Sequence, residues 1–392
     1  MIKISVIGLG FVGLTTAVGL RHQGFDVIGY DNDQARSEAI RQGIVPFHEP
    51  ALIEYMKLSP IQVAQTMDEA TQGAEVIFLC VGTPQGEDGK VDLSQIEGVL
   101  SGLKAKPEAL VVIKSTVPPG TTKGLKSQYA LANNPEFLRE GHAWEDFMMP
   151  DRIVCGVSDA RSQALLAQIY APFHAPVHFT SLNTAEFIKY LSNATLATAI
   201  SFSNEMAHLA DNIGDIQVAK AFKILHEDSR FSGSGIASYF YPGAGYGGYC
   251  LPKDTQALSA LAKERRIPTR VLDAVIRVND TRPAQCVEKI KKRCPDPKTG
   301  ITILGLSFKP ESDDVRASTS AKLIQGLLEA GYTQLNAYDP LSMNGFQQMY
   351  EFNIEYSPRL QAVVIIATGW EAFKTLDLSD KYVIDLRYLL EA

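Results

Sequence analysis

The distribution of apolar residues along the chain predicts two parallel sheets. In the first half, short apolar stretches alternate with segments of helical length, from KISVIG near the start through DVIGYD, EVIFLC and LVVIKS. Strands that are buried on both faces have this nearly continuous apolar composition, and crossover helices separate them in parallel sheets. The same order returns near the end, in ITILGL, LNAYDP, VVIIAT and YVIDLR. We therefore expect two doubly wound domains.

A helical segment of about thirty residues lies between the two repeats. It begins with Asn183, which Glu186 follows three residues later as in an N-cap, and Gly214 is expected to end it. The predicted fold is α/β, with two Rossmann-like parallel-sheet domains joined by this long central helix and a small helical dimerisation region. The expected domain boundaries are 1–182 for dinucleotide binding, 183–294 for the central region and 295–392 for the second sheet.

The composition narrows the function classes. The 392 residues carry a formal charge of −7 with 45% hydrophobic content, which argues against a general nucleic-acid or anionic-membrane partner. The N-terminal stretch MIKISVIGLG lacks the features of a secretory signal, and we expect a cytoplasmic protein. The five cysteines include no CxxC pair, so neither a disulfide framework nor a metal site is expected.

The first glycine loop predicts NAD binding. Gly8, Gly10 and Gly13 follow a strand and open a helix, where they would give a tight turn, an approach to a pyrophosphate and close helix packing. Asp31 at the end of the next strand would accept hydrogen bonds from the adenosine ribose and repel a 2′-phosphate. Arg36 would lie on the adenine side.

The second glycine loop differs from the first. Ser307 and Pro310 replace the second and third glycines, so the close pyrophosphate approach is lost and a cation appears. We expect a different phosphorylated ligand at the carboxyl ends of these strands. The cations expected around it are Lys309, Arg316 and Arg387.

The stretch GAGYGGYCLPKD places a cysteine at a reactive position. Cys250 follows a glycine run, and Pro252 is typical of a first helical turn, so the thiol is expected at a helix N-terminus. The helix dipole and Lys253 would favour the thiolate, and Asp254 would share its helical face. The other four cysteines are expected to be structural: Cys80, Cys155, Cys286 and Cys294.

Three further sets of polar residues accompany the cysteine. Lys189 and Asn193 are four apart on the long helix, where they would stabilise and orient an oxyanion. The segment NNPEFLREG is interpreted as a helix start with Glu136 and Glu140 on one face, and Thr116 ends a first-domain strand. A nicotinamide site together with a nucleophilic thiol suggests oxidation of a primary alcohol to a carboxylate with two NAD⁺ consumed.

Six ordered motifs resemble the UDP-glucose/GDP-mannose dehydrogenase family: GLGFVGL, VGTP, STVPPGTT, NPEFLREG, GYGGYCLPKD and SFKPESDDVRAS. The form YGGYCLPKD is most similar to members that act on UDP-glucose, so the resemblance implies NAD as cofactor and UDP-glucose as substrate. It also implies a homodimer built on the central helix, in which Arg230 reaches the neighbouring subunit's site.

The resemblance assigns expected roles by position. The catalytic set is Cys250 as nucleophile, Lys189 and Asp254 with a water near Thr116 in alcohol deprotonation, Asn193 as an oxyanion contact and Glu136 as the base for thioester hydrolysis. The cofactor set is Gly8, Gly10, Val12, Gly13, Asp31, Arg36, Thr83, Thr116, Glu140, Lys253 and Arg316. The substrate set is Glu136, Phe137, Leu138, Lys189, Asn193, Arg230, Tyr239, Gly247, Lys309 and Arg387.

Some positions depart from the family pattern and keep alternatives open. Gly243 and Ala244 stand where short relatives often carry larger residues, and we expect their missing side chains to leave the substrate less covered. The same chemistry on GDP-mannose is one alternative, and a 2-acetamido sugar is a weaker one. A two-electron hydroxyacid or 6-phosphogluconate type dehydrogenase would not need Cys250, and neither would an NAD-sensing binding module.

Overall fold

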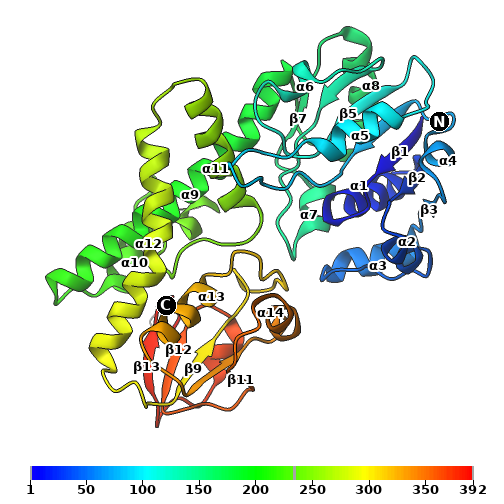
Figure 1. Cartoon of the computed structure of the whole chain (residues 1–392). Coiled ribbons are helices and arrows are strands. Elements are labelled where there is room, and N and C mark those ends of the chain that lie inside the picture. Colours follow the sequence, from blue (N-terminus) through cyan, green and yellow to red (C-terminus); the bar gives the residue numbers. More distant parts are fainter. Residues whose placement is uncertain (1, 233–234, 391–392) are drawn as a thin grey trace. The chain divides into compact units, whose positions relative to one another are not determined.

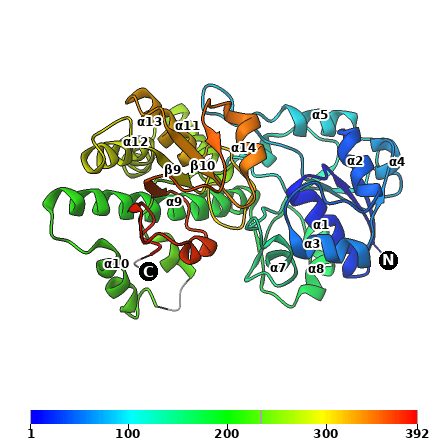
Figure 2. The ribbon, with the colours of Figure 1, turned by 90° about the horizontal axis from the view of Figure 1, so that it is seen from below.

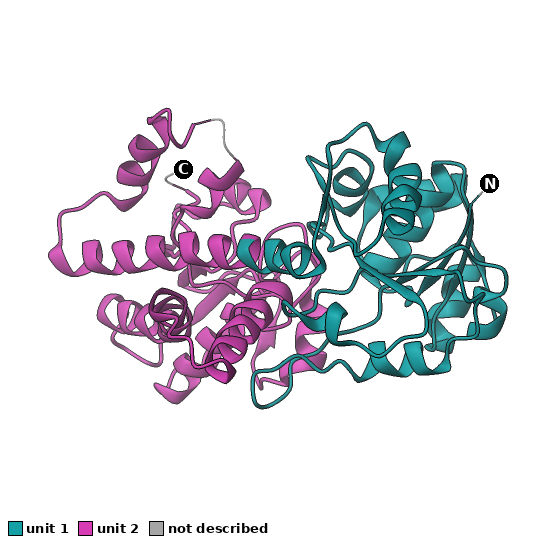
Figure 3. Cartoon of the chain, turned by 90° about the horizontal axis from the view of Figure 1, so that it is seen from above, with its two compact units in different colours: residues 1–191 teal, residues 192–392 magenta. Residues whose placement is uncertain are grey.

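The chain folds into two compact units, residues 1–191 and 192–392 (Figures 1 and 3). The structure is a computed structural model and describes residues 2–232 and 235–390. Each unit contains one Rossmann-like sheet with helices against it, so the predicted α/β class with two such sheets is confirmed. The division into three domains stays a prediction.

The described part of the first unit holds an eight-stranded sheet in the order β3-β2-β1-β4-β5-β6-β7-β8. Every neighbouring pair is parallel except β6 and β7, which meet antiparallel at Asn133 and Gly156. The strands are β1 (Lys3–Ile7), β2 (Asp26–Tyr30), β3 (Gln62–Val63), β4 (Val76–Leu79), β5 (Leu110–Ile113), β6 (Ala130–Asn133), β7 (Ile153–Gly156) and β8 (Val177–Thr180). The four strands expected from the apolar pattern form its centre, β2, β1, β4 and β5.

Helices bury both faces of this sheet. Side chains of α1, α3, α7 and α8 pack with Ile4, Val6 and Phe78 on one face, whereas α4 and α5 pack with Ile77 and Leu79 on the other. The ribbons of these helices can be followed in Figure 2. The helices of this unit are α1 (Phe11–His22), α2 (Gln34–Arg41), α3 (Pro50–Leu58), α4 (Met67–Thr71), α5 (Ser94–Gly102), α6 (Thr121–Gly124), α7 (Ala143–Met148) and α8 (Ala160–Tyr170).

The long central helix is confirmed as α9 (Leu182–Ile213), whose 32 residues are followed by Gly214 with a φ of 82°. The expected cap at Asn183 is wrong, because the Oγ of Ser181 accepts from the backbone N–H of Thr184 at 3.2 Å. The carboxylate of Glu186 has a different task. It accepts from the N–H groups of Gly120 at 2.6 Å and Thr122 at 2.7 Å, in the turn after β5.

The second unit is built on a five-stranded parallel sheet in the order β11-β10-β9-β12-β13. Helices α12 and α13 pack with Ile301 and Ile303 on one face, and Phe373 and Trp370 pack with Leu304 on the other. Its elements are α10 (Val218–Glu227), α11 (Cys250–Glu264), α12 (Arg270–Arg293), β9 (Ile301–Leu304), α13 (Thr319–Glu329), β10 (Leu335–Tyr338), α14 (Met343–Tyr350), β11 (Glu355–Tyr356), β12 (Val363–Ile366) and β13 (Tyr382–Asp385), with 3₁₀ turns at Gly235–Tyr239 and Glu371–Thr375.

Candidate active site

The first glycine loop has the geometry that a dinucleotide needs. Gly8 has a φ of 89°, and a Cβ at Gly13 would lie 1.7 Å from the carbonyl oxygen of Gly8, so neither position accepts a side chain. At Gly10, in contrast, a Cβ would meet no atom within 4 Å. Gly10 precedes α1, and Val12 lies in its first turn. The open space at Gly10 is therefore beside the N–H groups of a helix N-terminus, where a pyrophosphate binds favourably.

Asp31 stands directly after β2 and connects the loop to the adenosine side. One of its oxygens accepts from the N–H of Leu9 at 2.6 Å and the other from the N–H of Asp33 at 2.9 Å. The guanidinium of Arg36 lies 3.1 Å from the carboxylate. The structure thus brings together the two residues expected on the ribose and adenine sides, Asp31 and Arg36.

Two threonines meet at the carboxyl ends of β4 and β5. The hydroxyl of Thr83 donates to the backbone oxygen of Thr116 at 3.0 Å. Ligands bind at this end of a doubly wound sheet. Both residues therefore lie at the ligand-binding end of the sheet, and their roles at the cofactor and in catalysis stay predictions.

A buried ion pair joins Glu136 to the long helix. The Nζ of Lys189 lies 2.8 Å from Oε1 of Glu136, and the side chains are only 5% and 7% exposed. The other carboxylate oxygen accepts from the N–H of Leu138 at 2.6 Å. Burial alone would raise the pKa of Glu136, but the ammonium of Lys189, the N–H of Leu138 and Lys114 together hold it below its usual value. Glu136 is therefore held as a carboxylate.

The loop around Glu136 is not helical, and the expected helix start is wrong. Residues 134–140 are irregular, and α7 begins at Ala143. Glu136 is buried whereas Glu140 is partly exposed, so the two do not share a helical face. The ring of Phe137 is contacted by two cations, Arg152 at 4.3 Å and Lys189 at 5.4 Å from its centroid.

In the second unit, Cys250 is the first residue of α11 and its side chain is exposed. Pro252 lies in the first turn, as expected, and Tyr249 precedes the helix. The other cysteines have a different environment, in which burial raises the pKa of both Cys80 and Cys155 to about 12 and also raises that of Cys286. Cys294 is buried as well. Cys250 is thus the exposed thiol among the described residues.

Asp254 lies one turn after Cys250 and is buried between two donors. The Nδ2 of Asn193 donates to one carboxylate oxygen at 2.6 Å, and the Nζ of Lys253 donates to the other at 2.6 Å. The three side chains are at most 6% exposed. The predicted catalytic residues Asn193 and Asp254 therefore form one hydrogen-bonded group with Lys253.

Sequence reasoning missed the aromatic ring of Tyr249. The guanidinium carbon of Arg316 lies 4.5 Å from its centroid and the Nζ of Lys253 lies 5.5 Å from it. Burial raises the pKa of Tyr249, although the nearby Arg316 opposes the shift. Its position between a glycine pair and Cys250 was the available signal. The ring connects the two cations that were expected at the cofactor.

The glycine run before Cys250 is closely approached by the chain itself. A Cβ on Gly247 would lie 2.5 Å from the backbone oxygen of Ala317, and the N–H of Gly248 donates to the backbone oxygen of Arg316 at 2.9 Å. A Cβ on Gly243 would lie 2.0 Å from Nη1 of Arg387. The missing side chain at Gly243 therefore does not leave an opening, because the guanidinium of Arg387 occupies that space, and Ala244 is 1% exposed in the core.

In the second glycine loop, donors of the protein itself form hydrogen bonds to the carboxylate of the acidic residue, Asp339. Asp339 follows β10 as Asp31 follows β2, and the N–H of Leu306 donates to it at 2.8 Å. The remaining donors to its carboxylate are the backbone N–H and hydroxyl of Ser307, the N–H groups of Leu341 and Ser342, and the indole of Trp370. The loop therefore differs from a dinucleotide loop in two ways: Ser307 replaces a glycine, and the carboxylate of Asp339 already accepts hydrogen bonds from the protein.

The other residues expected at the substrate lie in different settings. Lys309 is partly buried with its Nζ 5.9 Å from the ring centroid of Phe308, and burial lowers the pKa of Arg387. Tyr239 ends a 3₁₀ turn. Arg230 is exposed and pairs with Asp228 at 2.5 Å.

Comparison with known proteins accounts for this arrangement. Residues 2–174 match the NAD binding domain of the UDP-glucose/GDP-mannose dehydrogenase family, 183–281 its central domain and 302–392 its UDP binding domain. The chain belongs to this family. As in other UDP-glucose/GDP-mannose dehydrogenases, NAD is the cofactor, and the open space at Gly10 and the acid Asp31 fit it.

Individual members of the UDP-glucose/GDP-mannose dehydrogenase family resemble the chain over nearly its whole length. A UDP-glucose 6-dehydrogenase of Rickettsia bellii (strain RML369-C) is 36% identical, covering 100% of this chain and 96% of the relative. The solved structure of a UDP-glucose dehydrogenase from Pyrobaculum islandicum is 35% identical with a TM-score of 0.92, covering 99% and 95%. A GDP-mannose dehydrogenase from Pseudomonas aeruginosa is 28% identical with a TM-score of 0.56, covering 98% and 96%.

Residues 2–232 and 235–390 contain neither a metal-binding cluster nor a membrane-spanning helix. No group of three or more His, Cys, Asp or Glu side chains in these ranges is arranged to hold a metal ion. No helix in the same ranges is long and apolar enough to cross a membrane.

Proposed function

We propose that this dehydrogenase oxidises UDP-glucose to UDP-glucuronate and reduces two NAD⁺ in each turnover. The observation that carries the proposal is the exposed thiol of Cys250 at the N-terminus of a 15-residue helix. A two-electron alcohol dehydrogenase needs no such thiol, whereas oxidation of an aldehyde to an acid is assisted by one. The relatives named UDP-glucose 6-dehydrogenase support the same substrate.

The first unit would hold the cofactor. Gly8, Gly10, Val12 and Gly13 would receive the pyrophosphate at α1, and Asp31 with Arg36 would receive the adenosine ribose and adenine. The proposed cofactor set is completed by Thr83, Thr116, Glu140, Lys253 and Arg316. When bound, NAD⁺ accepts the hydride that the sugar carbon loses in each of the two oxidations.

Cys250 would allow the second oxidation to proceed through two covalent intermediates. After the alcohol has lost a hydride and a proton, the thiol adds to the aldehyde carbon and gives a thiohemiacetal. Loss of a second hydride and a proton converts this adduct into a thioester. Water then attacks the carbonyl carbon, the C–S bond breaks, and the thiol and the carboxylate are released.

The polar groups around these steps have complementary charges. Lys189 and Asn193 would stabilise negative charge on the sugar oxygen, and Asp254, with a water near Thr116, would help to remove the alcohol proton. Glu136 is held as a carboxylate and would accept a proton from the attacking water. The hydrogen bonds and the burial described above support these roles.

The second sheet would bind the nucleotide. The family's UDP binding domain covers residues 302–392, and the phosphate oxygens would be met by Lys309 and Arg387. Tyr239 and Gly247 would cover the nucleotide, and Phe137 and Leu138 would line the sugar. Because the carboxylate of Asp339 already accepts hydrogen bonds from the protein, we expect the ribose of the nucleotide not to contact Asp339.

We further propose a homodimer built on α9. Phe202, Leu209 and Ile213 lie on one face of this helix at 49%, 51% and 65% exposure. Residues separated by seven and four positions share a helical face, so the three form one apolar stripe. Arg230 would reach the neighbouring subunit's site, and its 82% exposed side chain leaves it accessible.

The NADH yield per nucleotide sugar tests the proposed reaction. Limiting amounts of UDP-glucose, UDP-galactose, UDP-N-acetylglucosamine and GDP-mannose are each supplied with excess NAD⁺. Two NADH per UDP-glucose and none from the others are expected. One NADH per sugar would remove the thioester route, and activity on GDP-mannose alone would assign a different substrate.

A further inference from the structure

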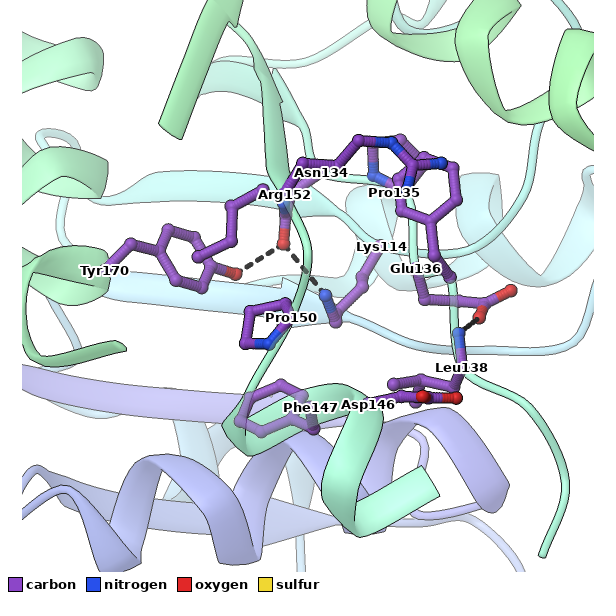
Figure 4. A pocket seen from close by; sticks show the side chains of 12 residues that line it. Lys114, Asn134, Pro135, Glu136, Leu138, Asp146, Phe147, Pro150, Arg152 and Tyr170 are labelled. Carbon is purple, nitrogen blue, oxygen red and sulfur yellow. Dashed lines mark hydrogen bonds between the residues drawn. The ribbon is translucent and has the colours of Figure 1, made fainter. Parts of the chain in front are cut away.

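A second lysine lies buried close to the segment that carries Glu136. Lys114 directly follows β5, is 5% exposed, and donates from Nζ to Oδ1 of Asn134 at 2.9 Å. The hydroxyl of Tyr170, at the end of α8, donates to the same oxygen at 2.5 Å. Figure 4 shows both donors converging on the amide of Asn134. None of these three residues has a role in the proposed reaction.

The amide of Asn134 is held on both of its ends. While Oδ1 accepts from Lys114 and Tyr170, Nδ2 donates to the backbone oxygen of Val154 in β7 at 2.8 Å. Lys114 after β5, Val154 of β7 and Tyr170 of α8 therefore hold the side chain of Asn134. Rotation of the Asn134 side chain would break at least one of these hydrogen bonds in a buried region, where an unpaired polar group is destabilising.

Only Pro135 separates Asn134 from Glu136. The ring of a proline fixes its own φ and restricts the residue before it, so the backbone between the two side chains has little freedom. The orientation fixed at Asn134 is therefore transmitted to Glu136, whose carboxylate contacts Lys189 and the N–H of Leu138. Lys114 and Glu136 also line the same pocket (Figure 4).

Lys114 also contributes charge. Burial lowers the pKa of Lys114, while Glu136 nearby favours its ammonium form. The other titratable groups near Lys114 are Lys189, Cys80, Cys155 and Tyr170, and burial raises the pKa of both thiols and of the phenol, so these three are neutral near pH 7. Asp146 and Arg152 also line the pocket, where Asp146 pairs with Arg139 at 2.7 Å. Lys189 and Lys114 are therefore the two cations that lower the pKa of Glu136, and the carboxylate of Asp146 in the same pocket is paired with Arg139.

We propose that Lys114 is a positioning residue for Glu136: with Tyr170 it fixes Asn134, and through Asn134 and Pro135 it holds the carboxylate in place for the step in which water attacks the thioester. This inference rests on the proposed function, because it assigns Glu136 to that step. It predicts that Lys114 acts on thioester hydrolysis and leaves the two hydride losses largely unchanged.

The test is Lys114→Met in the full chain, followed by stopped-flow NADH absorbance and mass spectrometry of the trapped protein. We expect the NADH burst to keep its rate, the Cys250 thioester to accumulate, and kcat to fall by about tenfold, since small misplacements of a catalytic group have such effects. The acidic limb of the kcat profile should move to higher pH, because loss of a cation raises the pKa of Glu136. An unchanged kcat and limb, or an equal loss in the burst, would overturn the proposal.

Tyr170→Phe separates orientation from charge and guards against a Lys114 variant that does not fold. It removes one donor to Asn134 and keeps the cation, so a smaller accumulation of thioester without a shift of the limb is expected. If the acidic limb of the kcat profile shifts in Tyr170→Phe as far as in Lys114→Met, the charge of Lys114 is not the cause of the shift. Normal thioester hydrolysis in Tyr170→Phe would show that the hydrogen bonds to Asn134 do not position Glu136. Lys104→Met, at an exposed lysine paired with Asp68, is the matched control and should leave every readout unchanged.

A variant of Glu136 distinguishes failure of this inference from failure of the proposed function. If Glu136→Gln accumulates thioester while Lys114→Met does not, only the role of Lys114 is refuted. If no variant gives a covalent adduct on Cys250, the proposed thioester route is itself refuted.

Discussion

The ammonium of Lys189 lies 2.8 Å from the carboxylate of Glu136, and water has little access to either group. Removing one partner of such a buried pair leaves an uncompensated charge, whereas the pair together is compatible with a packed interior. The pair also divides two chemical tasks, because Lys189 lies on α9 and would stabilise a negative oxygen while Glu136 lies on the 134–140 loop and would activate water. Substitutions at the two positions should therefore have different kinetic signatures.

Glu136→Gln should block the release of product more than its formation. The amide keeps the shape of the side chain but cannot accept a proton from water. The rate of thioester hydrolysis should therefore fall by about 10²- to 10⁴-fold, the usual contribution of a general base. Rapid mixing should show one rapid NADH burst followed by slow turnover. A burst and steady state that decline together would assign Glu136 to the hydride steps instead.

Lys189→Met is expected to slow the burst itself. The variant removes the cation that would stabilise the developing oxyanion, and it leaves Glu136 buried without its main partner. The measurement is the burst rate across pH, with Lys223→Met on the exposed face of α10 as the comparison. A burst of normal rate in Lys189→Met would show that another group stabilises the oxyanion.

Asp31→Asn should relax the preference for NAD over NADP. The amide can still accept from the N–H of Leu9, while the negative charge that would repel a 2′-phosphate is gone and Arg36 stays beside it. We expect the ratio of kcat/KM values for the two cofactors to shift by about tenfold, or about 1.4 kcal/mol. Asp33→Asn, at a more exposed carboxylate that also contacts Arg36, should leave the ratio unchanged.

Gly243→Ala should weaken sugar-nucleotide binding without affecting NAD. The added methyl group would lie 2.0 Å from Nη1 of Arg387, so the guanidinium must move from its present position. If Arg387 contacts the UDP phosphates, KM for UDP-glucose rises several-fold while the dissociation constant of NAD stays constant. Gly235→Ala is the control, because a Cβ there meets no atom within 4 Å. Equal behaviour of the two variants would remove Arg387 from the nucleotide site.

Asp339→Asn should destabilise the second unit in a pH-dependent manner. Burial alone would raise the pKa of Asp339, but the N–H groups of Leu306, Leu341, Ser342 and Ser307 bring it below its usual value. The carboxylate therefore contributes stability above the unfolded pKa of about 3.9, and this contribution is lost as the pH falls through the folded pKa. Urea unfolding should show a loss of about 1–3 kcal/mol at pH 7 that shrinks toward pH 3. A constant difference across pH would show that the charge is not involved.

The sequence predicted the central strands well because apolar composition alone determines burial on both faces. The helical spacing of its residues predicted the long helix, but not its cap, since Ser181 and Asn183 are both good capping residues and only the path of the chain decides between them. The direction of β7 against β6 has no periodicity signal, and the antiparallel contact there was not foreseen.

Local spacing was a poor guide to the 134–140 loop and a good guide to α11. Glu136 and Glu140 are four apart, yet the Asn-Pro sequence holds the backbone extended, so the helical interpretation failed. Cys250 and Asp254 are also four apart, and there the helix forms. Lys114, Asn134 and Tyr170 come from separate strands and a helix, and no short-range pattern could have brought them together.

The carboxylate of Glu186 ties the first turn of α9 to the turn after β5 through the N–H groups of Gly120 and Thr122. Thr116 stands four residues before that turn and Lys189 three residues after Glu186. The hydrogen bonds of Glu186 therefore link the two segments that carry Thr116 and Lys189. If the beginning of α9 tilts, both side chains should move together and keep their spacing. Substitution of Glu186 would remove this link. The expected effect is a slower deprotonation of the alcohol, with the affinity for the substrate unchanged.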